Sequence, residues 1–331
     1  QLVTNGISTL DVAAHNLDNI TWNNNGTVNW NTANIVLNGS TINNQSGATW
    51  NILTTGPADD MTGSGTFNNL AGGIVNANAA AGSNSIHPAL VNYIGTINLL
   101  QGDLDFDGNV VINFNGIINF SNGTAIRALS FAGTPTVNFN PGASINLVSG
   151  SAAMVFEAAV PVNFNTSLTI PVGLNVTLNS AILNVNAGST IVNSVFANNG
   201  TVNLQGGTLI LAEAGNPVDV GNYTMTSGML QLDSNRQFTN GAFNFTGGSF
   251  NINGATVAIG TLAGASSFNN LLLTDGGTIT GTDTITVNGN FTWSNGIYNG
   301  GALTIIGTAD ISEAAAIMNA VYTNNGLTNI L

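Results

Sequence analysis

The fold is decided by a short pattern that recurs through the middle of the chain: VINFNG (111–116), TVNFNP (136–141) and PVNFNT (161–166). Further copies in the same style are ILNVNA (182–187), TVNLQG (201–206) and AFNFTG (242–247). Apolar and polar residues alternate in each copy until a turn residue follows, and a period of two is the signature of a β-strand. The first five copies recur every 19 to 25 residues or so, which is typical of the coils of a solenoid.

The alternation assigns the apolar members of these copies to one face of each strand, where we expect a buried core ladder. Its ten residues are Ile112, Phe114, Val137, Phe139, Val162, Phe164, Leu183, Val185, Val202 and Leu204. Successive coils stack like on like at about 4.8 Å, so Phe114, Phe139 and Phe164 should form one column. We predict a single right-handed parallel β-helix over residues 1–331, with the handedness taken from the rule for parallel crossovers.

Asparagine occupies the opposite face of the same copies, for example at Asn113, Asn138 and Asn163. Stacked carboxamides form hydrogen-bonded ladders in cross-β assemblies. We therefore expect asparagine ladders that run along the outside of the solenoid.

Two segments depart from the rhythm. Residues 56–90, with the run GIVNANAAAGSNSIHPA (73–89), are predicted to be a loop or insertion. Residues 312–331 are predicted to be an atypical terminal cap. Within this cap, SEAAAIMNAV (312–321) is either a short helix that begins at Ser312 or another strand or loop.

The composition is unusually poor in charge. Charged residues make up 5% of the chain, there are 15 Asp and Glu against two Arg (Arg127 and Arg236), and the formal net charge is −13. This balance excludes nucleic acid as a partner, because nucleic-acid binding needs a basic surface. No apolar run reaches the roughly 18 to 20 residues of a membrane span, so no membrane span is expected.

An extracellular or cell-surface location is expected. The chain begins at Gln1 rather than Met, as a processed product does, and it offers almost no site to a trypsin-like protease. The absence of cysteine fits this location, because a long repetitive sheet needs no disulfides. Several Asn-x-Ser/Thr sequons occur, and six of them are taken as candidate glycosylation sites: Asn25, Asn38, Asn122, Asn165, Asn199 and Asn290.

The flanks WNNNGTVNWNTANIVLNGSTINN (22–44) and FTWSNGIYNGGALTIIGTADI (291–311) share a layout of strand, Asn-Gly, strand, Gly and strand. In this repeat style the chain resembles secreted bacterial β-solenoid repeat proteins of the haemagglutinin-like adhesin and autotransporter passenger type. The resemblance implies a surface protein with an adhesive or structural role. It carries over no catalytic residues.

One candidate metal site lies in DLDFDG (103–108), which matches the start of a calcium-binding loop. The loop would need a Glu at its twelfth position, where Phe114 stands instead. The favoured interpretation is a strand with Leu104 and Phe106 inside and the three carboxylates of Asp103, Asp105 and Asp107 on a solvated outer face. A surface Ca²⁺ that relieves their repulsion is the alternative. No other cofactor is expected.

Catalytic candidates are sparse, and we do not expect an enzyme. Asp59 and Asp60 are adjacent, Glu157 lies in an apolar stretch, and His15 and His87 are isolated. A polysaccharide-degrading β-helix enzyme would need clustered carboxylates, often with a basic companion. The four Trp residues, at positions 22, 30, 50 and 293, are either core packing near the ends of the solenoid or sugar-stacking platforms.

These observations favour an extracellular structural protein that self-assembles into a surface filament, sheath or matrix. Its partners would be other copies of itself, joined head to tail or laterally. The alternative is a surface adhesin, a solenoid stalk or passenger domain that presents loops such as 56–90 to glycans or host surfaces. A polysaccharide-degrading enzyme is a distant third.

Overall fold

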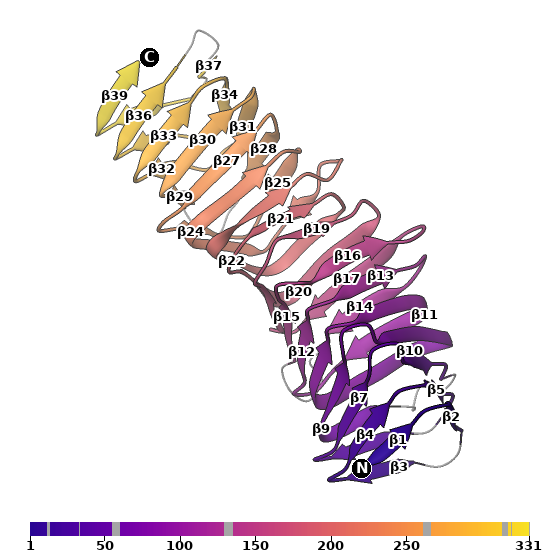
Figure 1. The fold of residues 1–331 in the computed structure, drawn as a ribbon. Coiled ribbons are helices and arrows are strands. Elements are labelled where there is room, and N and C mark those ends of the chain that lie inside the picture. Colours follow the sequence, from indigo (N-terminus) through magenta and orange to yellow (C-terminus); the bar gives the residue numbers. More distant parts are fainter. Residues whose placement is uncertain are drawn as a thin grey trace. The chain divides into compact units, whose positions relative to one another are not determined.

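The protein is a parallel β-solenoid of about 14 turns, with 66% of its residues in strands and no helix among the residues described (Figure 1). The computed structural model describes residues 1–11, 14–32, 34–54, 60–128, 135–260, 266–312, 317–318 and 320–330. The predicted all-β class and the parallel stacking of coils are confirmed.

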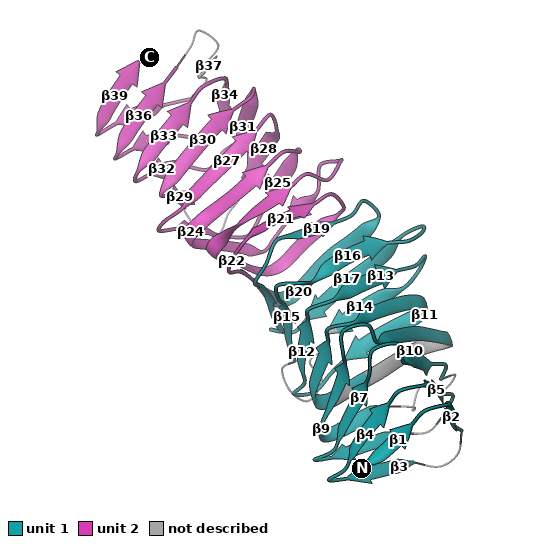
Figure 2. Ribbon diagram, viewed as in Figure 1, with its two compact units in different colours: residues 1–181 teal, residues 182–331 magenta. Residues whose placement is uncertain are grey.

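The chain divides into two compact units, residues 1–181 and residues 182–331 (Figure 2). The strands that begin in unit 1 are β1 Leu2–Thr4, β2 Ile7–Leu10, β3 His15–Asp18, β4 Thr21–Asn24, β5 Thr27–Trp30, β6 Ile35–Asn38, β7 Thr41–Asn44, β8 Thr49–Ile52, β9 Met61–Asn69, β10 Ile74–Tyr93, β11 Thr96–Phe106, β12 Val111–Phe114, β13 Ile117–Phe120, β14 Ala125–Ala128, β15 Thr136–Phe139, β16 Ser144–Leu147, β17 Ala152–Glu157, β18 Pro161–Phe164, β19 Leu168–Ile170 and β20 Leu174–Val185.

The strands of unit 2 are β21 Ser189–Val192, β22 Phe196–Leu211, β23 Val218–Asp219, β24 Asn222–Leu232, β25 Arg236–Phe238, β26 Phe243–Phe245, β27 Ser249–Asn253, β28 Thr256–Ile259, β29 Ser266–Phe268, β30 Asn270–Thr274, β31 Gly277–Gly281, β32 Ile285–Val287, β33 Asn290–Trp293, β34 Gly296–Asn299, β35 Leu303–Ile305, β36 Thr308–Ile311, β37 Ile317–Met318, β38 Tyr322–Asn324 and β39 Leu327–Ile330.

Each coil of unit 1 contributes three strand segments, and parallel pairing between coils builds three walls. Wall A contains β1, β4, β7, β12, β15 and β18, wall B contains β2, β5, β8, β13 and β16, and wall C contains β3, β6, β14, β17 and β20. The longer strands β9, β10 and β11 each pass from one wall to another. The register places identical residue types in line, as in Asn113↔Asn138 and Phe114↔Phe139.

Aromatic side chains form a continuous column along the inner side of wall A, to which β8 of wall B contributes Trp50. Its members are Trp22, Trp50, Phe67, Tyr93, Phe114, Phe139 and Phe164, and neighbouring ring centroids lie 5.1 to 6.2 Å apart. These separations are those of favourable aromatic pairs. All ten residues that were expected in the core ladder are at most 1% exposed, and the column extends that ladder toward the N-terminus.

The corner between walls A and B is tight enough to require glycine. A Cβ atom on Gly95 would lie 2.2 Å from the carbonyl oxygen of Gly73, and one on Gly116 would lie 2.0 Å from that of Gly95. Any larger residue would push successive coils apart at this corner.

The expectation of a loop at residues 56–90 was wrong for the part described. Met61–Asn69 forms β9, and Ile74–Tyr93 forms β10; residues 55–59 lie outside the described residues. The strand pattern was hidden because small residues take inward positions, as Ala77 and Ala79 do beside Val75. At the C-terminal end, Ile317–Met318 forms strand β37, which favours the strand alternative over a helix; residues 313–316 and 319 lie outside the described residues.

Unit 2 repeats the arrangement, with β23, β25, β28, β31, β34 and β37 forming a separate six-stranded parallel sheet. Its core contains an aromatic cluster in which the Phe243 ring lies 4.9 Å from Phe238 and 5.5 Å from Phe268.

We expect Phe139→Asp to prevent unit 1 from folding, because the substitution places an unpaired charge in a fully buried column. Asn138→Asp is the matched control, since its new carboxylate lies on the half-buried outer face. Thermal unfolding followed by circular dichroism measures both. A cooperative transition of normal size in Phe139→Asp would contradict the assigned core.

Candidate functional site

Asparagine ladders run along the outer faces of unit 1. On wall A the ladder contains Asn23, Asn43, Asn68, Asn92, Asn113, Asn138 and Asn163, with Nδ2···Oδ1 distances of 2.8 to 2.9 Å. On wall B it contains Asn29, Asn51, Asn76, Asn98, Asn119 and Asn146, at 2.8 to 3.0 Å. In every bond the Asn of the later coil donates to the Asn of the preceding coil, so each ladder has a direction. The predicted ladders are confirmed.

A third ladder is buried, which the sequence reasoning missed. Asn24, Asn44 and Asn69 are 0% exposed. Asn24 Nδ2 donates to Asn44 Oδ1, and Asn44 Nδ2 donates to Asn69 Oδ1, both at 2.8 Å. Asn44 Nδ2 also donates to the backbone carbonyl of Ile74 at 2.9 Å. The signal was the doubled asparagine at 23–24, 43–44 and 68–69, in which the first residue faces out and the second faces in.

The acidic stretch contacts one of the two arginines. Arg127 Nη2 lies 3.0 Å from Asp103 Oδ2, and the register sets Arg127 beside Asp105. Leu104 and Phe106 are fully buried, as the strand interpretation requires. The expected solvated face was wrong for Asp105, which is only 8% exposed, and Asp107 follows the end of β11. Arg127 offsets part of the repulsion that motivated a calcium ion, and the described residues hold no group of three or more His, Asp or Glu arranged for a metal. The calcium site stays a prediction.

The six sequons differ in their exposure. Asn25, Asn38, Asn122, Asn199 and Asn290 are exposed, whereas Asn165 is half-buried and donates to Asn140 Oδ1 at 2.9 Å. A glycan on Asn165 would have to displace this contact, so the five exposed positions are the better acceptors.

The other candidates do not converge on one site. All four Trp side chains are at most 4% exposed, which supports the packing interpretation and leaves no indole face for a sugar. Glu157 is half-buried at the end of β17. Asp59 and the side chain of His87 lie outside the described residues.

A buried charge cluster occupies the core of unit 2. Arg236 is 0% exposed, and Glu213 and Asp219 are each 1% exposed. Arg236 Nη1 donates to Asp219 Oδ2 at 2.5 Å and to the Phe196 carbonyl at 3.2 Å, and Arg236 Nη2 contacts Glu213 Oε1. The guanidinium carbon lies 5.9 Å from the centroid of the Phe196 ring.

Asp219 is the centre of this cluster. Besides Arg236, its carboxylate accepts from the Tyr223 hydroxyl at 2.6 Å and from the Asn198 backbone N–H at 3.1 Å. Two carboxyl groups face a single guanidinium, so its one positive charge cannot balance two carboxylate charges. Burial raises the pKa of Asp219 from 3.8 to about 7 and lowers the pKa of Arg236 from 12.5 to about 9. The sequence signal for an inward arginine was its two-residue spacing from the buried Phe238.

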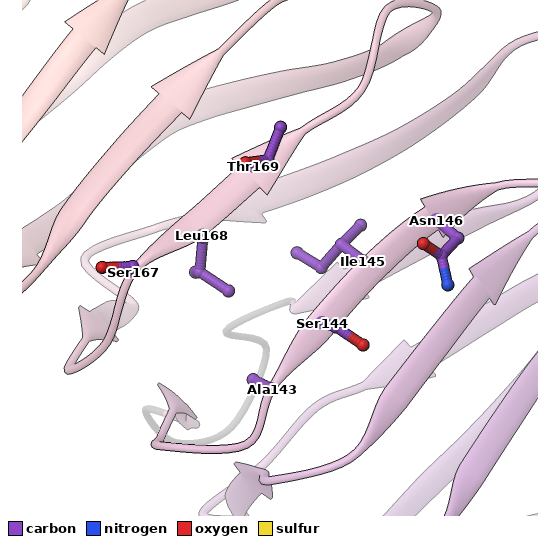
Figure 3. Close-up of a pocket in the computed structure, with 7 residues that line it drawn as sticks. All are labelled: Ala143, Ser144, Ile145, Asn146, Ser167, Leu168 and Thr169. Carbon is purple, nitrogen blue, oxygen red and sulfur yellow. The ribbon is translucent and has the colours of Figure 1, made fainter.

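Wall B of unit 1 opens between two successive coils. β19 follows β18 as β16 follows β15, yet β16 pairs only with β13 and no ladder joins it to β19. The neighbouring strands of the same two coils are paired, β15 with β18 and β17 with β20. The opening is a cavity of about 320 Å³, lined by Ala143, Ser144, Ile145, Asn146, Ser167, Leu168 and Thr169 (Figure 3). We call it the wall B window.

Comparison with known proteins gives no match: no protein-family model, no curated protein and no solved structure is similar to this sequence. The class that the structure defines is therefore the β-solenoid with asparagine ladders. Among the described residues there is no helix of the length and apolar character that a membrane crossing needs.

We expect Asn44→Ala to lower the free energy of unfolding by about 1–3 kcal/mol, because it removes the partner of buried groups on both neighbouring coils in a dry interior. Asn43→Ala, one residue earlier on the half-buried outer face, should cost less than about 1 kcal/mol, since water replaces the lost bonds. Urea unfolding measures the difference. Equal costs for the two variants would show that burial does not set the strength of these ladders.

The Asp219 carboxyl makes stability depend on pH. Its pKa is higher in the folded protein (about 7) than the ordinary 3.8, so the folded state keeps a proton that the unfolded state loses between these values. The contribution of Asp219 is therefore fully present below about pH 4, falls as the pH rises, and is lost above about pH 7, with a slope of up to about 1.4 kcal/mol per pH unit.

Asp219→Asn should remove this slope while keeping an oxygen that accepts from Asn198. The measurement is urea unfolding of both proteins at several pH values between 4 and 8. Parallel pH profiles for the two proteins would contradict the assignment of the proton to this cluster.

Proposed function

We propose that the protein is an extracellular structural protein whose copies associate laterally into a surface filament, sheath or matrix. The observation that carries the proposal is the pair of long outer asparagine ladders on walls A and B. They give unit 1 two neutral polar faces with a repeat fixed by the coil spacing.

The ladders retain hydrogen-bonding capacity for a neighbour. A carboxamide has two N–H donors and two acceptor sites on oxygen, and each ladder bond uses one of each. The remaining donor and acceptor sites recur every coil, at about 4.8 Å. A second copy lying alongside has the same repeat, so many weak contacts form in one register, and no charged group of the ladders has to be desolvated.

Exposed apolar side chains on the same faces also favour association, because contact with a second copy removes them from water. Val111 on wall A and Ile117 on wall B start consecutive strands of one coil, and they are 37% and 42% exposed. Natural sheet proteins use charged residues, lysine above all, to prevent such association, and this chain has no lysine. The extracellular part of the proposal is supported by the scarcity of protease-sensitive basic residues and by five exposed sequons.

The adhesin alternative has less support. Its presenting loop, 56–90, is largely strand, and the tryptophans that would stack on sugars are buried. No described feature favours it over lateral association.

Electron microscopy of the purified protein tests the proposal. We expect laterally bundled fibres or sheets, and we expect added salt to promote them, because salt screens the repulsion between chains of net charge −13. The double variant Val111→Lys, Ile117→Lys should remain folded and assemble far less, since it places cations on both ladder faces.

The matched control is Val148→Lys with Val172→Lys, which changes two exposed valines to lysine outside the strands. This control has the same charge and should assemble like the parent. Dispersed single particles of the parent protein at all salt concentrations would refute the proposal. Equal loss of assembly in both double variants would refute the role of the ladder faces.

A further inference from the structure

The corners of the solenoid repeat a chemically reactive dipeptide. An asparagine deamidates most readily when glycine follows it, because glycine has no side chain to hinder the attack of its backbone nitrogen on the carboxamide carbon. The dipeptide stands at the corner between walls A and B as Asn5-Gly6 and Asn25-Gly26, and in unit 2 as Asn199-Gly200 and Asn325-Gly326. Since all four pairs have glycine in the second position, a difference in reactivity between them has to come from the structure.

The glycine N–H is held by a side chain in three of these pairs. An inward asparagine precedes each of the three, and its carboxamide oxygen accepts from the glycine N–H two residues later. The bonds join Gly26 to Asn24, Gly200 to Asn198 and Gly326 to Asn324, at 2.9 to 3.0 Å. The nitrogen that would attack has to give up this hydrogen bond before it can react, and a neutral carboxamide oxygen is too weak a base to take its proton.

The pair Asn5-Gly6 has no such bond. The inward residue before it is Thr4, which the register places over Asn24. The Thr4 hydroxyl accepts from Trp22 Nε1 at 3.0 Å instead. Within the described part of the chain, the Gly6 N–H has no hydrogen-bond acceptor.

Exposure to solvent points to the same pair. Both residues are exposed in the pairs 5–6, 38–39, 122–123 and 325–326. In the last three the glycine N–H donates, to Ser64 Oγ at 3.1 Å, to the Ser151 carbonyl at 2.6 Å and to Asn324 Oδ1 at 2.9 Å. The pair 5–6 therefore offers hydroxide a glycine N–H that makes no other bond.

From these features we propose that Asn5 is a site of spontaneous deamidation, and that the inward Asn24, Asn198 and Asn324 protect the Asn-Gly pairs beside them. The Asn5 carboxamide is polarised for this reaction, because Asn25 Nδ2 donates to Asn5 Oδ1 at 3.0 Å. A donor at this oxygen stabilises the negative charge that develops there during the attack.

The reaction needs water alone. Hydroxide removes the Gly6 N–H proton, the nitrogen bonds to Asn5 Cγ, and the bond from Cγ to Nδ2 breaks as ammonia leaves with a proton taken from water. Water then opens the succinimide ring at either carbonyl, which gives aspartate or isoaspartate at position 5. One neutral carboxamide becomes one carboxylate, which still accepts from Asn25. The proposal does not depend on self-assembly.

The test incubates the full chain in mildly alkaline buffer and follows each Asn-Gly pair by mass spectrometry. Pepsin makes the fragments, because the chain has only two sites for trypsin. Synthetic peptides with the sequences 2–9 and 22–29 give the rates without folded structure. Relative to its peptide, Asn25 should be slowed about 2- to 10-fold more than Asn5, the effect of one hydrogen bond.

Asn325 separates the effect of the hydrogen bond from the effect of position in the solenoid. Asn5 lies in the first coil described and Asn325 in the last, and each corner pairs with one neighbouring coil, through Asn25 N–H to Thr4 and Asn325 N–H to Ile305. Loose terminal coils would make both asparagines react fast. We expect Asn325 to react as slowly as Asn25.

Two substitutions exchange the corners. Thr4→Asn supplies a carboxamide oxygen with two acceptor sites, enough for both Trp22 and Gly6, and should slow Asn5 about 2- to 10-fold. Asn24→Thr is the reciprocal change and should speed Asn25. Thr4→Asn removes no buried asparagine, so it decides the question even where Asn24→Thr fails to fold.

Three results would overturn the proposal. The first is equal slowing of Asn5 and Asn25 relative to their peptides. The second is an Asn325 that reacts as fast as Asn5, and the third is an unchanged rate at Asn5 in Thr4→Asn.

Discussion

Parallel backbone pairing between coils, at fixed register, is the constraint on which the rest of this protein depends. It places each residue directly over its counterpart one coil away, so side chains interact mainly with copies of their own kind. Phe114 lies against Phe139 with ring centroids 5.1 Å apart, and Asn113 accepts from Asn138 at 2.9 Å. The sequence becomes repetitive because a column tolerates only residues that pack on, or hydrogen-bond to, themselves. Asparagine satisfies this condition, since one carboxamide carries both donor and acceptor.

The same constraint separates two ways of burying polar groups. In unit 1 the inward Asn24, Asn44 and Asn69 satisfy one another along a single column, and no other residue type is required. Arginine has donors only, so an inward Arg236 cannot be satisfied by its own kind. Unit 2 meets this need with two carboxylates, that of Glu213 and that of Asp219, which lies one coil earlier and opposite Phe238, two residues beyond Arg236. Removing one partner of such a buried ion pair is costly. The buried asparagine column is different, because the carboxamides that remain after the loss of one coil still hydrogen-bond to one another.

How far the structure follows from the sequence can be traced to particular residues. The Val-Asn-Phe-Asn strands were predictable, because large apolar residues alternate with asparagine and their spacing matches one coil. The strand β10 was not recognised, because inward Ala77 and Ala79 carry too little apolar surface to show the alternation. In β9 the inward positions include Gly65 and Asn69, which hide the alternation in the same way. The buried ladder was missed because every asparagine was assigned to the outer face. Two adjacent strand residues point to opposite faces, so one asparagine of the pair 43–44 had to point inward. Arg127 was not placed beside Asp103, because contacts between coils require the register, and the coil length varies between neighbours.

The wall B window shows which departures a solenoid wall tolerates. Replacing asparagine by threonine in a ladder is not enough to open a wall, since Asn203 pairs with Thr224 and Asn253 with Thr274 in closed walls of unit 2. A proline in the strand is not enough either, because Pro161 begins β18 and wall A remains paired there from Val137↔Val162 onward. Wall A keeps its closing donor, Asn165 N–H to Phe139 at 2.9 Å, after the paired segment. After β19, Pro171 stands at the closing position itself. Thr169, two residues earlier, has no carboxamide to continue the asparagine ladder of wall B. The backbone N–H that follows a short strand, more than the N–H of its first residue, therefore decides whether two coils stay paired.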